Sequence, residues 1–221
     1  MIKKILITGG AGFVGSHLSE QIFSKFKKSL IIIIDKLSYA GNKKFLKNIT
    51  DFKRVLFLKV DICNYDKMLK LTKDVDLAIN VAAESHVDRS FNNSFNFTKT
   101  NTYGAHVFFE ACKINKVKKI IQISTDEVYG EIKKGNHSEK DILNPTNPYA
   151  GSKAAAEMIL NSYNSSFKTK IITVRGNNLY GNRQHPEKII PHTISSILKK
   201  KKINIHGDGK QKRCFLHVDD F

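Results

Sequence analysis

Two side chains with reactive groups, Tyr149 and Lys153, stand four residues apart in a segment whose pattern predicts a helix from Tyr149 to Phe167. At this spacing both side chains project from one face of a helix. An ammonium group beside a phenol favours the phenolate, so we expect a lowered pKa at Tyr149 and a role as general base. Such pairs also occur on ordinary solvated helices, so this one gains weight only beside a nucleotide site.

A glycine-rich turn near the start of the chain predicts such a site. It follows a predicted strand, Ile2 to Thr8, and precedes a helical pattern that runs to Phe26. Gly9, Gly12 and Gly15 would allow a tight turn and let a pyrophosphate approach the N–H groups of the helix N-terminus. A glycine-rich turn can be only a loop, but the strand before it and the helix after it favour dinucleotide binding.

The second predicted strand, Leu30 to Asp35, indicates which dinucleotide is bound. An acid at the end of this strand accepts hydrogen bonds from the ribose hydroxyls and repels a 2′-phosphate. Asp35 therefore favours NAD over NADP, although Lys36 beside it weakens that preference.

Strands and helices alternate along the rest of the chain. This alternation predicts a Rossmann-like α/β fold, a doubly wound parallel sheet with helices on both faces and ligands at the carboxyl ends of the strands. The further predicted strands are Val55 to Val60, Leu77 to Val81, Ile120 to Ser124 and Ile171 to Val174, and the further predicted helices are Tyr65 to Lys73 and Asn101 to Asn115.

Composition limits the classes of protein to consider. A chain of 221 residues can bury one α/β core and the start of a second domain. No apolar run approaches the ~20 residues that span a bilayer, and the first strand leaves no room for a signal peptide, so we expect a soluble cytosolic protein with no membrane partner. Three cysteines without metal-ligand spacing predict reduced thiols and no metal site.

The net charge of +17 raises the alternative of a nucleic-acid-binding protein. The lysines are spread along the chain, however, and only Lys199 to Lys202 form a run. No basic stripe alternates with aromatic residues, as single-strand binding would need. We therefore expect no nucleic-acid partner, and a modest preference for anionic ligands such as sugar nucleotides.

Several segments together resemble the nucleoside-diphosphate-glucose 4,6-dehydratases, which are extended short-chain dehydrogenase/reductases. The matching segments are TGGAGFVGS at 8–16, AAESHVDRS at 82–90, STDEVYG at 124–130, the Tyr149 and Lys153 pair, and PEKIIP at 186–191. The resemblance covers essentially the whole chain, and the doublet Asp126-Glu127 is its most specific part. Residues 97–99, 110–113 and 175–181 look more like the UDP-glucose enzymes of plant-type rhamnose synthesis than the bacterial dTDP-glucose enzymes.

The resemblance implies a mechanism. The C5 proton of a hexose is not acidic until C4 is a ketone, so NAD must first take hydride from C4 and later return it to C6. Tyr149 beside Lys153 resembles the base for the 4-hydroxyl group, and Thr125 would hold the C4 oxygen. Glu127 would remove the C5 proton while Asp126 protonates the departing 6-hydroxyl group. Taken alone, Asp126-Glu127 would more often be a solvated loop or a helix cap.

The resemblance also implies binding residues. His86 could be mistaken for an acid or base, but a histidine that packs or caps locally is commoner. Gly181-Asn182 departs from the Gly-Pro of the family, and Gly151 replaces a residue with a side chain. The implied cofactor contacts are Gly9, Gly12, Phe13, Val14, Gly15, Asp35, Lys36, Asp61, Ile62, Ala82, Ala83, Thr100, Tyr149 and Lys153, and the implied substrate contacts are Ser85, Thr125, Asn178, Lys188, His206 and Arg213.

The predicted domain division is an NAD-binding domain over residues 1–175 and the start of a sugar-nucleotide-binding region over 176–221. His217 to Phe221 resembles the opening of a helix, and the family continues for roughly a hundred more residues that complete the pocket, so we expect a truncated chain that binds NAD but turns over weakly. The resemblance implies a homodimer through the helices at 101–115 and 149–167. A sugar-nucleotide 4-epimerase and a non-catalytic NAD-binding fragment remain alternatives.

Overall fold

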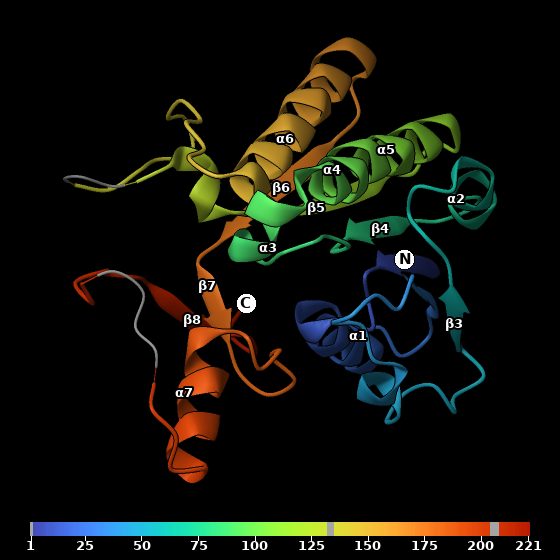
Figure 1. Cartoon of the computed structure of the whole chain (residues 1–221). Coiled ribbons are helices and arrows are strands. Elements are labelled where there is room, and N and C mark those ends of the chain that lie inside the picture. The colour runs from blue at the N-terminus through green and yellow to red at the C-terminus, as the bar shows by residue number, and fades with distance from the viewer. Residues whose placement is uncertain (1, 132–134, 204–207) are drawn as a thin grey trace. The chain divides into compact units, whose positions relative to one another are not determined.

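A parallel sheet of six strands organises residues 1–176, one of the two units into which the computed structural model divides (Figure 1). The strand order is β3-β2-β1-β4-β5-β6. This order is that of a dinucleotide-binding Rossmann sheet, whose ligand crevice lies where the order reverses, between β1 and β4. The strands are β1 (Lys4–Thr8), β2 (Leu30–Asp35), β3 (Val55–Lys59), β4 (Leu77–Asn80), β5 (Lys119–Thr125) and β6 (Ile171–Gly176).

The structure describes residues 2–131, 135–203 and 208–221. Within them the predicted fold class is confirmed, and each of the six predicted strands is present with its ends shifted by at most two residues. Apolar runs bounded by polar turns are strong signals for buried parallel strands, which explains this agreement.

Helices cover both faces of the sheet, because successive strand side chains point to opposite sides. On one face α1 (Phe13–Lys25) packs through Ile22 on a cluster that includes Ile5 and Ile33. On the other face Leu6 and Ile32 belong to the cluster under α2 (Tyr65–Leu71), α5 (Ala105–Ile114) and α6 (Pro148–Phe167). Burying each such Leu or Ile contributes about 1.5–3 kcal/mol, so these clusters fix the sheet that carries the site.

The segment between β4 and α5 differs from its prediction. Instead of one helix beginning at Asn101, two short helices, α3 (Val87–Asn92) and α4 (Ser94–Phe97), lead into a π-helical segment, η2 (Thr98–Gly104). A Cβ at Gly104 would lie 2.6 Å from Ile62 Cγ2, so glycine permits the close approach of η2 to the end of β3. Such π-helical insertions are frequent at functional sites.

The second unit, residues 177–221, contains α7 (Ile189–Leu198) and a parallel pair of short strands, β7 (Asn178–Tyr180) and β8 (Phe215–His217). The predicted opening of a helix over His217 to Phe221 is present only as a turn at residues 218–220. His217 ends β8, and the N–H of Val218 donates to Tyr180 O at 2.9 Å, which extends the pairing with β7. Val218 is buried, and the Asp220 N–H donates to His217 O at 3.0 Å, so the chain turns directly after β8.

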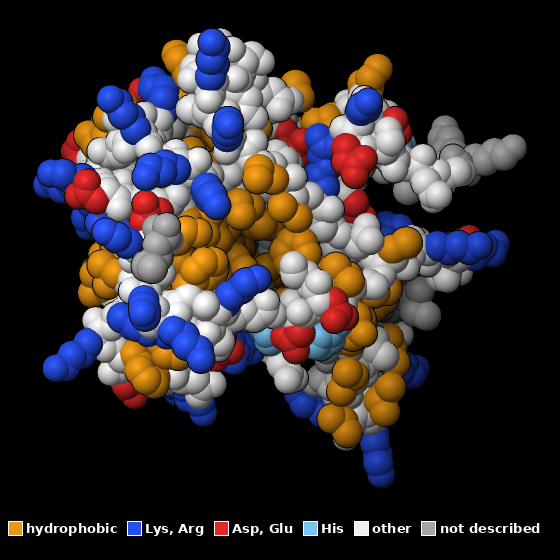
Figure 2. Space-filling model, turned by 180° about the vertical axis from the view of Figure 1, so that it is seen from behind, with side chains coloured by type: hydrophobic (Ala, Val, Ile, Leu, Met, Phe, Trp, Pro, Cys, Tyr) orange, Lys and Arg blue, Asp and Glu red, His pale blue; other side chains and the backbone are white. Residues whose placement is uncertain are grey.

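Three further features concern the thiols, the surface charges and the hydropathy of the helices. Cys63, Cys112 and Cys214 are free thiols. Figure 2 shows lysine and arginine side chains spread over the visible face, with apolar side chains between them, rather than gathered in one stripe. Across the described residues, no helix combines the length and hydropathy that crossing a bilayer requires.

Candidate active site at the carboxyl edge of the sheet

Thr125 lies at the junction between β5 and a short 3-10 helix, η3 (Asp126–Tyr129), which begins with the two predicted acids. The Thr125 hydroxyl accepts a hydrogen bond from the Glu127 N–H at 3.3 Å and donates one to Asp126 Oδ1 at 3.3 Å. It is also hydrogen-bonded to the Tyr149 hydroxyl. One buried threonine therefore brings together the predicted base and both predicted acids.

Asn147 connects the acids to the start of α6. Its Oδ1 accepts the Ala150 N–H at 2.8 Å, which caps the helix, and its Nδ2 donates to Glu127 Oε2 at 3.0 Å. Pro148 follows at the first helical position, where its missing N–H costs nothing. The Asn-Pro pair is a recognisable helix start that the sequence analysis missed, because it placed the beginning of the helix at Tyr149.

Tyr149 and Lys153 lie on α6, as predicted, and both are buried. The Tyr149 ring meets Phe97 edge-on, with ring centroids 6.3 Å apart. The Lys153 ammonium donates to Ile123 O, on β5, at 2.6 Å. The first turns of α6 are therefore held against the carboxyl end of the strand that leads into Thr125.

The predicted lowering of the Tyr149 pKa is wrong. Burial raises the pKa of Tyr149, the charge of Glu127 raises it further, and the hydrogen bond with Thr125 only partly opposes them. Burial also lowers the pKa of Lys153 to about 8, although the charge of Glu157 opposes this shift. Burying a phenolate costs free energy, and this cost outweighs the lowering of the pKa that we expected from the Lys153 ammonium four residues away.

The glycine turn between β1 and α1 has a shape that side chains would fill. Gly9 has a φ of +65°, and a Cβ there would lie 2.6 Å from Ala82 Cα. A Cβ on Gly15 would lie 2.1 Å from Gly9 O. Gly12 caps α1 without a side-chain hydrogen bond, and Phe13 and Val14 form its first turn, so the turn presents backbone N–H groups.

Asp35, at the end of β2, supports this turn. Its Oδ2 accepts the Ala11 N–H at 3.0 Å and its Oδ1 accepts the Leu37 N–H at 2.7 Å. Burial raises the pKa of Asp35, while the two backbone hydrogen bonds lower it. The carboxylate predicted to face the ribose is therefore fixed in position by the chain itself.

The ends of β3 and β4 supply the other predicted cofactor contacts. Asp61 Oδ1 accepts the Cys63 N–H at 2.9 Å, and Ile62 is buried. The N–H of Ala82 donates to Thr8 Oγ1 at 3.2 Å, which holds the backbone leading to Ala83 close to the glycine turn.

A polar cluster joins three residues that lie far apart in the sequence, Lys36, Glu84 and Thr100. The Lys36 ammonium lies 2.8 Å from Glu84 Oε1 and donates to Thr100 Oγ1 at 3.1 Å. The buried amide of Asn101 accepts the Glu84 N–H at 2.8 Å and donates to Glu84 O at 2.9 Å. A third hydrogen bond, from Asn101 Nδ2 to Ser152 Oγ at 2.9 Å, ties this loop to α6.

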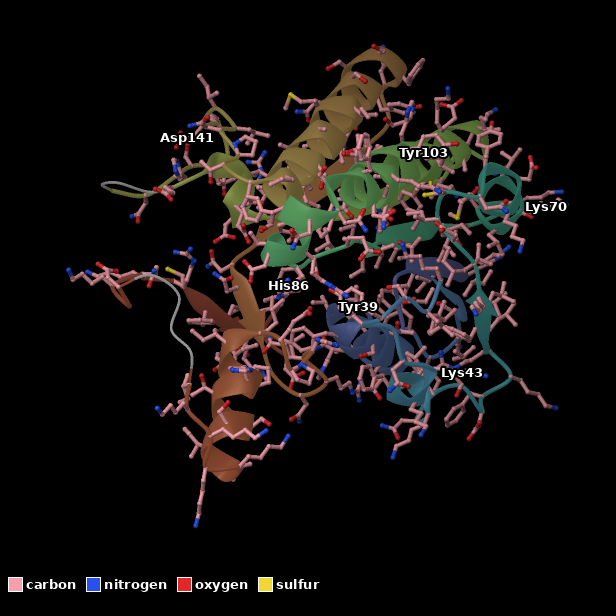
Figure 3. The ribbon with its side chains drawn as sticks, in the orientation of Figure 1. Tyr39, Lys43, Lys70, His86, Tyr103 and Asp141 are labelled. Carbon is pink, nitrogen blue, oxygen red and sulfur yellow. The ribbon has the colours of Figure 1, made fainter. Side chains whose placement is uncertain are left out.

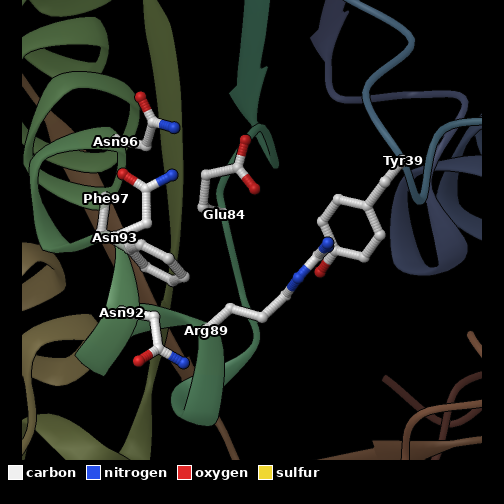
Figure 4. A pocket seen from close by; sticks show the side chains of 7 residues that line it. All are labelled: Tyr39, Glu84, Arg89, Asn92, Asn93, Asn96 and Phe97. Carbon is white, nitrogen blue, oxygen red and sulfur yellow. The ribbon is translucent and has the colours of Figure 1, made fainter.

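A cavity of about 330 Å³ lies beside this cluster, within the first unit. Figure 4 shows Arg89 reaching from α3 toward Tyr39 of the loop after β2, and the guanidinium carbon lies 3.7 Å from the centroid of the ring. The other lining residues are Glu84, Asn92, Asn93, Asn96 and Phe97. Polar groups and the aromatic rings of Tyr39 and Phe97 share the walls, which suits a ligand that combines a flat ring with polar groups.

His86, labelled in Figure 3, caps α3: its Nδ1 accepts the Arg89 N–H at 3.3 Å. The expectation of a local capping role is confirmed. Ser85, a predicted substrate contact, immediately precedes it in the loop after β4.

The remaining predicted substrate residues belong to the second unit. Asn178 begins β7, and its N–H donates to Cys214 O at 3.2 Å. Lys188 caps α7, and Arg213 is exposed, with Nη1 donating to Lys212 O at 2.8 Å. His206 lies outside the described residues. The roles of these four residues stay predictions.

A buried network under the site was also missed by the sequence analysis. Glu157 Oε2 accepts from Arg175 Nη2 at 2.6 Å, and Glu157 Oε1 accepts from the Ser124 hydroxyl. Arg175 Nη1 donates to the Tyr129 hydroxyl of η3. These contacts join residues that are 18 to 46 positions apart, so no local pattern could have revealed them.

Comparison with known proteins places the chain in a family. The dTDP-D-glucose 4,6-dehydratase of Dictyostelium discoideum is 46% identical over 99% of this chain and 54% of its own length. A trifunctional UDP-glucose 4,6-dehydratase of Arabidopsis thaliana is 44% identical over 99% of this chain and 34% of its own length. The chain thus spans about half or less of these relatives.

A solved structure shares the fold of this chain. The dTDP-glucose 4,6-dehydratase DesIV from Streptomyces venezuelae, crystallised with NAD bound, superposes with a TM-score of 0.95 at 35% identity, covering 98% of this chain and 69% of DesIV. The model of the GDP-mannose 4,6 dehydratase family matches residues 6–221, and the chain belongs to that family.

Proposed function

We propose that this chain is the NAD-binding and catalytic part of a nucleoside-diphosphate-glucose 4,6-dehydratase. Its reaction converts UDP-glucose or dTDP-glucose to the corresponding 4-keto-6-deoxy sugar nucleotide by loss of water. The observation that carries this proposal is the junction at Thr125, where one hydroxyl contacts Tyr149, Asp126 and the backbone of Glu127.

The residues present fit NAD. A turn that leaves no room for a Cβ at Gly9 or Gly15 lets a pyrophosphate approach backbone N–H groups. Asp35 stands where the ribose hydroxyls of a dinucleotide are bound, and the buried carboxylate disfavours a 2′-phosphate. The chemistry that NAD supplies when bound is the removal of hydride from C4 and its later return to C6.

The chain's own residues then move the protons. Tyr149 removes the proton of the 4-hydroxyl group, and the neighbouring Lys153 stabilises the phenolate that burial disfavours. Thr125 donates a hydrogen bond to the C4 oxygen. Glu127 takes the C5 proton, the C6–O bond breaks, and Asp126 gives its proton to the departing hydroxyl group, so that water leaves and a C5–C6 double bond remains. When hydride returns to C6, Glu127 gives a proton to C5, and this proton comes from solvent if Glu127 has exchanged.

The test is product analysis in deuterium oxide under single-turnover conditions. We expect a 4-keto-6-deoxy product that carries deuterium at C5. Glu127→Gln retains an acceptor for Asn147 but removes the base, so it should permit hydride removal and abolish labelling at C5. The exposed Glu131 offers a matched control, since Glu131→Gln should leave the product unchanged.

Other results would contradict the proposal. An unlabelled galactose-type product would identify a 4-epimerase, which has no use for Glu127. A Tyr149→Phe variant that behaves as the wild type would identify a non-catalytic NAD-binding protein. Calorimetry with NAD tests the cofactor separately from the chemistry.

Several finer features belong to the same proposal. Comparing turnover of UDP-glucose and dTDP-glucose decides the nucleotide preference, and a UDP-glucose preference would support a role in rhamnose synthesis. A homodimer through α5 and α6 is supported by the exposed apolar side chains of Ile114, Met158 and Phe167. Sedimentation and cell fractionation test the dimer and a cytoplasmic location.

A further inference from the structure

The residue after Asp35 is a lysine, and its charge is compensated by one carboxylate. Lys36 Nζ lies 2.8 Å from Glu84 Oε1, and the two side chains are 31% and 14% exposed. A cation at this place in a dinucleotide fold is suited to bind a 2′-phosphate. Glu84 therefore forms an ion pair with the Lys36 ammonium, which could otherwise bind the 2′-phosphate of NADP.

The position of Glu84 is fixed by other residues. The amide of Asn101 binds both the N–H and the carbonyl of Glu84, and Asn101 is itself held by Ser152. Asn101 is 2% exposed, so this clamp is protected from water. The Glu84 side chain is thus presented to Lys36 by a rigid backbone.

The charges around Asp35 favour NAD, which lacks the 2′-phosphate of NADP. Asp35 and Glu84 each contribute a negative charge and Lys36 one positive charge, so the cluster is net negative. The charge of Glu84 reaches Asp35, whose pKa it raises. Within a few ångströms and partly shielded from water, a carboxylate repels a phosphate dianion substantially.

We propose that Glu84 is a specificity-determining residue that keeps the site selective for NAD over NADP by neutralising Lys36. This inference rests on the proposed function, because it assumes that the dinucleotide lies along Asp35. It assigns the selectivity to two carboxylates, Asp35 and Glu84, rather than to Asp35 alone.

The test is the affinity of the full chain for NADH and NADPH, measured by nucleotide fluorescence at constant salt concentration. In Glu84→Gln, we expect the affinity for NADPH relative to NADH to rise about tenfold, which corresponds to about 1.4 kcal/mol. The double variant Glu84→Gln/Lys36→Met should lose this gain, because Lys36 would supply the contact. Lys36→Met alone should not raise the ratio and should lower it, because it leaves both carboxylates without their cation.

A matched control is Glu110→Gln on α5, which also removes a carboxylate 2.8 Å from a lysine, Lys113, and should leave the ratio unchanged. An unchanged ratio of NADPH to NADH affinity in Glu84→Gln would overturn the inference. A higher ratio that persists in the double variant would also overturn it, because another cation such as Arg89 would then bind the 2′-phosphate. A wild type that binds neither nucleotide would contradict the proposed function instead.

Discussion

Asn147 and Glu127 are joined by a hydrogen bond of 3.0 Å, from Nδ2 to Oε2, although the asparagine also caps the helix that carries Tyr149 and Lys153. Its two roles use different atoms of the amide. Substitutions that keep one atom and change the other can therefore separate the stability of α6 from the chemistry of Glu127.

We expect Asn147→Ala to lose about 1 kcal/mol of stability, because the helix loses its cap. Asn147→Asp keeps a capping oxygen but replaces the amide that donates to Glu127 Oε2 with a second carboxylate, whose like charge should push the Glu127 side chain away. Asn147→Asp should therefore keep most of the stability of the wild type but slow deuterium labelling at C5 by about tenfold or more. An unchanged labelling rate in Asn147→Asp would mean that Asn147 does not position the base.

The lowered pKa of Lys153 should make the stability of the protein depend on pH. Its pKa in the folded protein is about 8, below the ordinary value of 10.5. Between these values the unfolded chain binds more protons, so the contribution of Lys153 to stability rises with pH through this window and is least favourable below it. Lys153→Met should flatten this rise and add about 1–3 kcal/mol at pH 7.

The Met variant leaves the partly buried Ile123 carbonyl paired, because Gln122 Nε2 also donates to it at 2.9 Å. Denaturant unfolding between pH 7 and 10.5 measures the effect. Replacement of the exposed Lys170 by Met supplies the control, and it should leave the slope as in the wild type. A Met variant with an unchanged slope would show that Lys153 stays protonated throughout this range.

Two helical glycines predict opposite responses to alanine. A Cβ at Gly151 in α6 would meet nothing within 4 Å, whereas one at Gly104 would lie 2.6 Å from Ile62 Cγ2. Gly151→Ala should stabilise the protein by about 0.5–1 kcal/mol, since alanine restricts the unfolded chain. Gly104→Ala should destabilise it by about 1–3 kcal/mol through overpacking, and thermal unfolding compares the two. A Gly151→Ala variant that is less stable than the wild type would contradict the expectation that a Cβ at position 151 has room in the folded protein.

The sequence predicted the sheet because apolar clustering within each strand is a local signal. The region from Glu84 to Gly104 was harder to predict. Its helices are short, and its geometry depends on the contacts of Asn101 with Glu84, 17 positions away, and with Ser152, 51 positions away. The type of such a residue indicates polarity, but its partners are chosen by the tertiary fold.

The same distinction applies to the candidate site. The spacing of Tyr149 and Lys153 correctly placed both on one helix, because helical geometry is local. The pKa of Tyr149 was predicted in the wrong direction, since burial and the charge of Glu127 act through the packed structure. Charge effects therefore need the surroundings of a residue as well as its neighbours in the chain.

The pair of Glu157 and Arg175 gives the last prediction. Glu157 is 1% exposed, and its hydrogen bonds with Arg175 raise the pKa of the guanidinium. Arg175→Met leaves a buried carboxylate without its partner and should cost about 3–5 kcal/mol. Glu157→Leu/Arg175→Met removes both charges and should recover much of that loss.

Denaturant unfolding of the wild type, the single variant and the double variant measures this coupling. Asp208→Asn disrupts an exposed ion pair, with Lys210, and should leave the unfolding midpoint unchanged. A double variant no more stable than Arg175→Met would show that the hydrogen bonds of Glu157 with Ser124 and of Arg175 with Tyr129, rather than charge compensation, hold this network together. The second outcome would also predict that a Tyr129→Phe variant loosens η3 and slows the elimination step, because η3 carries Asp126 and Glu127.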